Sequence, residues 1–269
     1  MAKIPRLQQI SDYFKAVNIN ISNRLTDFLV VDYEKVNLTD AHWLPAFRPG
    51  YFEINLDVTA GCPVKVDGFV LSSVTNRLTL VSPYRLQSSM PTPVQPAIKP
   101  YKGYGIFFTQ EFIRANFSHS DFIKQFPFFH PFNSPSIYLD NGSTTQFVDI
   151  IHRIQYEYEH YGAFSEDIIK NYLQVLFLKA KQHYHYTQTT SVVNRDSEIY
   201  YAFQALVQDH YQELNTVKQY ADKMYISSKH LSETVKKVSG LSALQLIHKA
   251  QLSYASTQLL QTRKTVAEI

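Results

Sequence analysis

Residues 215–240 read NTVKQYADKMYISSKHLSETVKKVSG. Asn215 or Thr216 can cap a first helix, and Ser227 is a good N-cap residue for a second helix. Gly240 is placed to end that second helix, because glycine readily adopts the left-handed conformation found there. The stretch therefore predicts two short helices joined by a tight turn, a helix-turn-helix.

The second of these helices, predicted over 228–238, has an apolar face and a polar face. Leu231, Val235 and Val238 are spaced by four and three residues, so they should share the inward face. The polar residues around them are the candidates for DNA binding: Ser227, Ser228, Lys229, Ser232, Glu233, Lys236 and Lys237. The plain alternative is the solvated face of an ordinary helical bundle.

The chemistry of these polar residues suits a DNA groove. The major groove accepts one α-helix, whose N-terminal half reaches base edges while flanking groups hold phosphates. Lys229 and Ser232 fit base edges, whereas Lys236 and Lys237 fit phosphates. Ser227 and the free amides at the helix start can also bind phosphate. Double-stranded DNA is the expected partner.

Charge is unevenly distributed along the chain. The whole chain carries a formal charge of +3, but residues 215–264 hold eight Lys or Arg against two acidic residues, a local +6 that leaves −3 for the rest. Such asymmetry suggests a module that faces a polyanion, joined to a different kind of domain. A lysine-rich helical surface without a partner would carry the same charge.

The first half of the chain has the pattern of β-strands. In 51–58, YFEINLDV, the residues Phe52, Ile54, Leu56 and Val58 alternate and share one face. Several short strands of this kind, separated by turn residues, predict a small sandwich or barrel. The expected strands are 27–33, 51–58, 64–71, 77–81 and 104–108.

Helical periodicity follows the β half. Residues 147–161 and 166–183 form amphipathic patterns that can cover the β domain or pair with a second subunit. Residues 186–196 are polar and without periodicity, which indicates a linker. Further helices are expected at 198–212, 216–224, 228–238 and 243–260.

Residues 225–260 resemble the first helix-turn-helix and connecting helix of AraC/XylS-type bacterial transcription regulators. The matching positions, with the family's spacing, are Ile226-Ser227, Leu231-Ser232, Lys236-Lys237, Gly240 and Leu259-Leu260. The sequence departs from the family at Val235, where Phe is usual, at Ala243, where Pro is common, and at Gln251, where Arg is common.

The residues at the C-terminal end extend this resemblance. TVAEI at 265–269 is similar to the opening of the family's second helix-turn-helix. We therefore expect the sequence to be cut off within that unit and the natural protein to continue beyond Ile269.

A looser resemblance links 80–88 and 103–113 to the cupin-like sensor domain of the same family. It implies an α+β protein with a cupin-like, effector-sensing β-barrel at 1–145 and appended dimerisation helices at 146–185. A linker at 186–197 and an all-α, AraC-type helix-turn-helix domain at 198–269 would follow.

The implied function is that of a homodimeric DNA-binding transcription regulator controlled by a small-molecule effector. The alternative is a small-molecule-binding or protein-interaction module whose DNA-binding half is incomplete.

Catalytic and cofactor motifs are missing from the sequence. A cupin-type metal enzyme needs several histidines and a carboxylate from adjacent strands, but His42 is the only histidine before His119. No G-x-S-x-G, Walker or dinucleotide-binding motif occurs. The single cysteine, Cys62, fits a reducing compartment. We therefore expect no enzyme activity, no metal and no cofactor.

Three residues near the first long strand are the candidates for effector binding: His42, Trp43 and Arg48. Arg48 can pair with a carboxylate ligand, although an exposed loop arginine is the commoner case. Trp43 can instead cap the barrel. The chain shows neither a signal peptide nor a run of about 18 uncharged apolar residues, so a cytoplasmic protein is expected.

Overall fold

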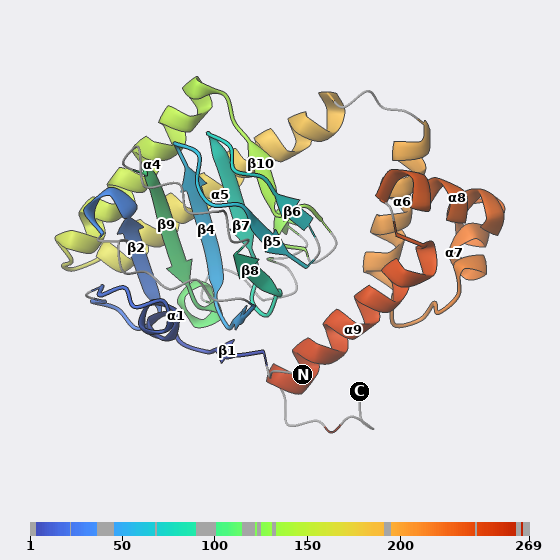
Figure 1. The fold of residues 1–269 in the computed structure, drawn as a ribbon, viewed down its shortest axis with the longest axis horizontal. Coiled ribbons are helices and arrows are strands. Elements are labelled where there is room, and N and C mark those ends of the chain that lie inside the picture. The colour runs from blue at the N-terminus through green and yellow to red at the C-terminus, as the bar shows by residue number, and fades with distance from the viewer. Residues whose placement is uncertain are drawn as a thin grey trace. The chain divides into compact units, whose positions relative to one another are not determined.

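The computed structural model describes residues 4–21, 23–36, 46–67, 69–89, 101–114, 122, 125–130, 133–190, 195–239, 241–261 and 265. The chain divides into two compact units, Met1–Tyr186 and Thr187–Ile269. The first unit holds the described strands, and the second contains helices only (Figure 1). The fold is therefore mixed, with α and β structure in the first unit and α structure in the second.

The described strands form three sheets. A five-stranded antiparallel sheet has the order β10-β7-β4-β9-β2, a three-stranded antiparallel sheet has the order β6-β5-β8, and β1 pairs in parallel with β3. The strands are β1 (Arg6–Leu7), β2 (Phe28–Asp32), β3 (Arg48–Pro49), β4 (Phe52–Asp57), β5 (Val64–Val66), β6 (Phe69–Leu71), β7 (Arg77–Val81), β8 (Gln87–Ser89), β9 (Gly103–Phe108) and β10 (Ser136–Tyr138).

None of these sheets closes into the expected barrel within the described residues. In the five-stranded sheet, β10 and β2 are edges that pair on one side only, with β7 and β9 respectively. The ladder hydrogen bonds of β5 are satisfied by β6 and β8 in a sheet of their own. The β part is therefore two facing sheets and a short strand pair.

Four of the five strands predicted from the sequence are confirmed, with shifts of at most one residue at their ends. The exception is 64–71, which is a hairpin made of β5 and β6 rather than one strand. The chain turns at Asp67, whose φ is 48°. Asp followed by Gly is a favoured sequence for a two-residue hairpin turn, so the reversal has a local cause.

The predicted helices are also confirmed. The first unit contains α1 (Ile10–Ala16), α2 (Gln110–Ile113), α4 (Asn141–Glu159) and α5 (Ser165–Thr190), with 3-10 turns η1 (Tyr33–Lys35) and η2 (Pro127–Phe129). The second unit contains α6 (Arg195–His210), α7 (Val217–Lys223), α8 (Ser228–Ser239) and α9 (Ala243–Gln261). The expected linker at 186–197 is shorter than predicted, because α5 runs to Thr190 and α6 begins at Arg195; residues 191–194 lie outside the described residues.

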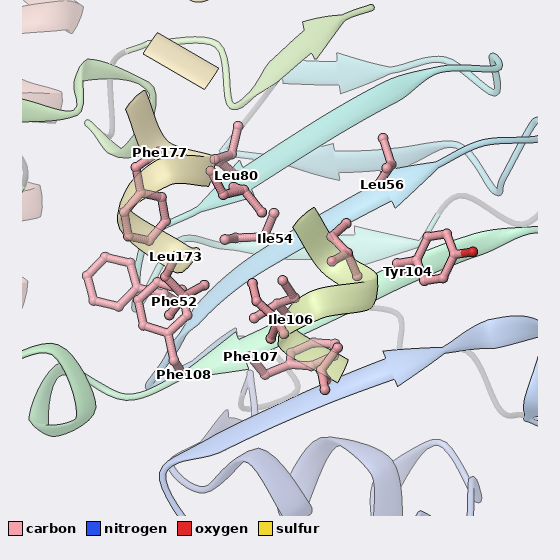
Figure 2. Close-up of a cluster of buried hydrophobic side chains, with 14 of the residues drawn as sticks. Phe52, Ile54, Leu56, Leu80, Tyr104, Ile106, Phe107, Phe108, Leu173 and Phe177 are labelled. Atoms are coloured by element: carbon pink, nitrogen blue, oxygen red, sulfur yellow. The ribbon is translucent and has the colours of Figure 1, made fainter. Parts of the chain in front are cut away.

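Strand β4 anchors the main core of the first unit. Its residues Phe52, Ile54 and Leu56 are buried on one face of the five-stranded sheet, as the alternation predicted (Figure 2). The Phe52 ring stacks on Phe108 of β9 with ring centroids 5.0 Å apart and an interplanar angle of 5°. Phe122 meets Phe52 edge to face at 5.3 Å.

Helices α4 and α5 cover this apolar face (Figures 1 and 2). Helix α4 begins after Asp140, whose side chain accepts a 2.7 Å hydrogen bond from the Ser143 amide. Leu173 and Phe177 of α5 are buried in the same cluster as the strand residues. The two amphipathic helices therefore form one layer over the sheet.

Replacing Phe52 with Ala should lower the free energy of unfolding by about 3–5 kcal/mol, because a buried ring is lost and a cavity remains. Chemical denaturation measures this change. Tyr156→Ala is the matched control: Tyr156 of α4 is 60% exposed, so its loss should change stability by less than about 1 kcal/mol. Equal losses for the two variants would contradict the assigned core.

Candidate functional site

The second unit contains the helix pair predicted from the sequence. Thr216 caps α7, because its hydroxyl accepts from the Gln219 amide while Gln219 Oε1 accepts from the Thr216 amide at 2.9 Å. This capping box settles the choice between Asn215 and Thr216. Tyr220 and Ala221 of α7 are fully buried where α7 packs against α8.

The turn between α7 and α8 is tight and locally determined. Tyr225 adopts a left-handed conformation with φ of 55° and is 96% exposed. The Ile226 amide donates to the Ala221 carbonyl at 3.1 Å, and the Ser227 hydroxyl accepts from the His230 amide at 3.1 Å. The prediction that Ser227 caps the second helix is therefore confirmed.

Helices α6 and α9 support this pair. Phe203 of α6 meets the Tyr220 ring edge to face at 5.5 Å, and the Tyr220 hydroxyl donates to the Leu214 carbonyl. Gln251 of α9 donates to the Tyr211 carbonyl at 3.2 Å and to Asn215 Oδ1 at 2.6 Å. The glutamine at this position thus joins α9 to the segment between α6 and α7.

Helix α8 buries one face and exposes the other. Leu231 and Val235 are fully buried, as predicted, while the side chain of Val238 lies outside the described residues. Lys229, Glu233 and Lys236 follow each other at intervals of four and three residues on the opposite, exposed face. We call these three residues the α8 outer face.

The other predicted DNA-binding residues have different surroundings. Ser228 and Ser232 are half-buried at the flank of α8. Lys237 Nζ lies 2.6 Å from Asp196 Oδ2 of α6, whereas in the described part of the chain Lys229 and Lys236 form no ion pair with a carboxylate. His230 is exposed in the N-terminal half of α8 and was not among the residues predicted to bind DNA.

The first unit contains a cavity of about 420 Å³ on the sheet face opposite the helices. It lies between the five-stranded sheet, the three-stranded sheet and α1. The apolar lining includes Phe14, Ile19, Phe47, Val64, Val66, Val81 and Phe107. The polar and tyrosine lining includes Tyr13, Tyr33, Glu53, Asn55, Asp57, Arg77, Thr79, Gln87, Ser88 and Tyr101.

Strand β4 supplies the polar floor of this cavity. Glu53, Asn55 and Asp57 alternate with the core residues of the same strand and so point to the opposite face. Thr79 and Arg77 of β7 stand in register with Asn55 and Asp57. The floor is therefore a patch of polar side chains from two paired strands.

Asp57 is neutralised within the floor. Arg77 Nε and Nη2 lie 2.8 and 2.6 Å from Asp57 Oδ2, and both residues are buried. The Tyr101 hydroxyl donates to Asp57 Oδ1 at 2.5 Å. Arg77 Nη1 donates to the Ser72 carbonyl, and Nη2 also donates to the Cys62 carbonyl. Each charge of the pair is thus balanced by the other and by hydrogen bonds.

Two glycines of β9 let tyrosine rings reach across to β4. A Cβ atom at Gly105 would lie 2.5 Å from the Tyr33 hydroxyl, and one at Gly103 would lie 2.5 Å from the Tyr101 hydroxyl. Because these glycines have no side chain, Tyr33 can donate to Asn55 Oδ1 at 3.0 Å. The walls of the cavity therefore depend on the two glycines.

Glu53 differs from Asp57 because it forms no ion pair with a cation among the described residues. Its carboxyl is buried, which raises its pKa to about 7, while the Gln87 amide acts in the opposite direction. Thr79, 4% exposed, has a hydroxyl without a hydrogen-bond partner in the described structure. The floor thus holds a carboxyl without an ion pair and a hydroxyl without a hydrogen-bond partner.

None of the three residues predicted to bind the effector is among the described residues that line this cavity. Arg48 belongs to β3, donates to the Tyr84 carbonyl and is not among the residues that line this cavity, so its role in effector binding stays a prediction. His42 and Trp43 lie outside the described residues. The polar residues at positions 53, 55 and 57 could have indicated the cavity. They were not recognised, because the polar residues of a strand with one buried face usually point into solvent.

Comparison with known proteins does not assign this chain to a family. No protein-family model and no curated protein matches the sequence. A solved structure described as the crystal structure of the AraC-like transcriptional activator CuxR aligns over 91% of this chain and 89% of that chain, at 11% identity and a TM-score of 0.36. Likeness at this level assigns no family, so the chain's own residues carry the functional inference.

Among the described residues, not one helix combines the length and the apolar character that crossing a membrane demands.

Glu53→Gln should stabilise the protein in a pH-dependent way. A raised pKa means that the folded state favours the protonated carboxyl, so wild-type stability is greatest below pH 4.5 and falls as the pH rises through about 7. Glutamine does not ionise. The variant should match the wild type near pH 4 and exceed it by about 3 kcal/mol above pH 8, since a tenfold change in proton affinity corresponds to about 1.4 kcal/mol.

Urea denaturation between pH 4 and pH 8.5 measures this difference. Glu34→Gln, which removes an exposed carboxyl, is the control and should show no comparable trend. A constant difference between wild type and Glu53→Gln across this range would show that Glu53 is not buried as described.

Proposed function

We propose that this protein is a DNA-binding transcription regulator. The observation that carries the proposal is the α8 outer face, where Lys229 and Lys236 stand exposed on a short helix whose opposite face is fixed by Leu231 and Val235. A helix presented in this way fits the major groove, and its lysines reach bases and phosphates.

Within that class, we propose a regulator of the AraC/XylS type. The support is the resemblance of residues 225–260, whose matching residues occupy coherent positions: Ser227 caps α8, Leu231 is buried, and Lys236 is exposed. Gln251, one of the departures from the family, has hydrogen-bond partners of its own in the second unit. The departure is therefore compatible with the same helical arrangement.

The lysines of α8 are assigned different tasks. Lys229 lies in the first turn, the part of a recognition helix that reaches base edges. Lys236 lies two turns later, where a lysine neutralises phosphate. Lys237 shares its charge with Asp196, so its contribution to phosphate binding should be smaller than that of Lys236.

The cavity of the first unit is proposed as the effector site. Its volume of about 420 Å³ is within the range of small-molecule sites, and it combines apolar walls with a few polar groups. Binding without chemical conversion is the proposed role, because the sequence offers no catalytic motif. The alternative, a binding module with an incomplete DNA-binding half, predicts ligand binding without DNA binding.

A homodimer through α5 is also proposed. Ile168, Val175 and Leu178 are exposed apolar residues at helical spacing on one stripe of this helix, which we call the α5 stripe. Contiguous exposed apolar surface is typical of a protein interface. Phe164, directly before the helix, extends the stripe at its N-terminal end.

DNA selected from a random pool by the 269-residue chain provides the test of DNA binding. Lys229→Ala should reduce the preference for selected over unrelated DNA by roughly tenfold, because one base contact is worth about 1–3 kcal/mol. Lys236→Ala should weaken binding to both DNAs alike and lower the slope of log affinity against log salt by about one. Electrophoretic or fluorescence titrations at several salt concentrations measure both effects.

Lys15→Ala, which removes an exposed lysine from α1 of the first unit, is the matched control and should leave DNA binding unchanged. A wild-type chain that enriches no sequence at low salt would count against the regulator and favour the alternative. Identical losses for Lys229→Ala and Lys236→Ala would remove the assignment of base reading to Lys229.

The double variant Val175→Asp, Leu178→Asp should raise the dissociation constant of the dimer at least tenfold, because two charges would enter an apolar contact. Sedimentation equilibrium over a range of concentrations measures this constant. Tyr156→Asp introduces a charge at an exposed aromatic residue of α4 and should leave dimerisation unchanged. A wild type that stays monomeric at all concentrations would rule out the α5 interface.

A further inference from the structure

The geometry points to a small organic cation as the ligand of the cavity: an amine on a flat aromatic body, with Glu53 as its counter-ion. The inference deepens the proposed function and rests on it for the role of the cavity as a sensor. The binding chemistry itself depends only on residues of the first unit.

The charges of the cavity floor favour a cation. Asp57 and Arg77 neutralise each other at 2.6 Å, so the uncompensated charge of the floor belongs to Glu53. A buried carboxylate is costly without a partner, and an ammonium group provides that partner. Arg77 is not available to bind an anionic ligand, because its charge is paired with Asp57 and its nitrogens donate to Asp57 and to the carbonyls of Ser72 and Cys62.

Hydrogen bonding favours an ammonium group over a neutral one. An ammonium has donors only, and several of them need acceptors. The Glu53 carboxylate provides one acceptor, and the hydroxyl of Thr79, which lines the cavity without a partner among the described residues, provides another. Both residues project from the same sheet face, on the neighbouring strands β4 and β7.

The aromatic walls favour a cation with a flat body. Tyr13 and Phe47 contact each other with ring centroids 5.3 Å apart, and Phe14 meets Phe107 edge to face at 5.2 Å. All four rings line the cavity. Ring faces attract cations, and ring edges and faces pack well against an aromatic ligand. These aromatic rings can therefore pack against the flat body of the ligand and also interact favourably with its positive charge.

Titration calorimetry of the whole chain tests the assignment with matched probes. The cations are 2-phenylethylamine and tryptamine; 2-phenylethanol is the neutral counterpart and 3-phenylpropanoate the anionic one. The amines should bind at least tenfold more tightly than the alcohol or the carboxylate. Absence of amine binding, or equal or tighter binding of the alcohol or the carboxylate, would overturn the proposal.

Glu53→Gln identifies the counter-ion. This variant should weaken amine binding at least tenfold and leave 2-phenylethanol binding within twofold of the wild type. Glu34→Gln, an exposed carboxyl outside the cavity lining, should change neither affinity. Amine affinity that is unchanged in Glu53→Gln would overturn the role of Glu53.

A measurement on the wild type keeps the test independent of any variant. With a pKa near 7, Glu53 is about half protonated at pH 7, so an arriving ammonium should release up to about half a proton. Calorimetry in phosphate and in Tris, whose ionisation enthalpies differ, measures this release, which should disappear near pH 8.5. Zero release at pH 7 would contradict a Glu53–ammonium contact.

The other titratable groups near Glu53 should not supply this proton. Burial raises the pKa of each neighbouring phenol above its ordinary value of 10 and also raises that of the Cys62 thiol, while Asp57 and Arg77 are paired. The phenols concerned are those of Tyr13, Tyr33, Tyr51 and Tyr101.

Different experimental results would contradict this proposal and the proposed function. Amine binding without any DNA binding would leave the ligand class standing and remove the regulator. Selected DNA bound with full specificity, in a chain that ignores amines, would do the reverse.

Discussion

Burial of β4 on both faces is the constraint on which the first unit depends. Phe52, Ile54 and Leu56 require a cover of apolar side chains, which α4 and α5 provide. Glu53 and Asp57 on the other face require compensation, because a buried carboxylate without a partner is costly. Asp57 is compensated by Arg77. Glu53 has no such partner, so it favours its protonated form or, as proposed, binds a cation. One strand thus fixes the core and the chemistry of the cavity together.

The abundance of aromatic residues, with 19 Tyr and 18 Phe, acquires two distinct uses in this arrangement. Stacked and edge-to-face rings around Phe52 fill the space under the helices. Tyrosines on the other face lie over the glycines of β9 and reach polar groups of β4, as Tyr33 does at Asn55. A ring with a polar end can border a cavity and still satisfy a buried partner.

The second unit follows simpler rules. Thr216 and Ser227 cap their helices through residues three positions away, and Leu231 and Val235 are buried at helical spacing. Burial of one face of α8 leaves its lysines on the opposite face. The same short-range geometry that defines the helix therefore presents Lys229 and Lys236 together.

The sequence by itself determined the helices of the second unit, their caps and inward residues, and four of five predicted strands, because these depend on contacts within a few residues. It did not reveal the hairpin at Asp67, although the Asp-Gly signal was present. The strand pattern left a sandwich and a barrel open, and the sheets of the described residues do not close into a barrel. Only the tertiary structure showed that β5 and β8 lie over β4. This arrangement places Glu53 and Thr79 in the lining of the cavity and Arg48 outside it. Whether the second face of a strand meets solvent or another sheet depends on residues distant in the sequence, and alternation alone carries no record of that partner.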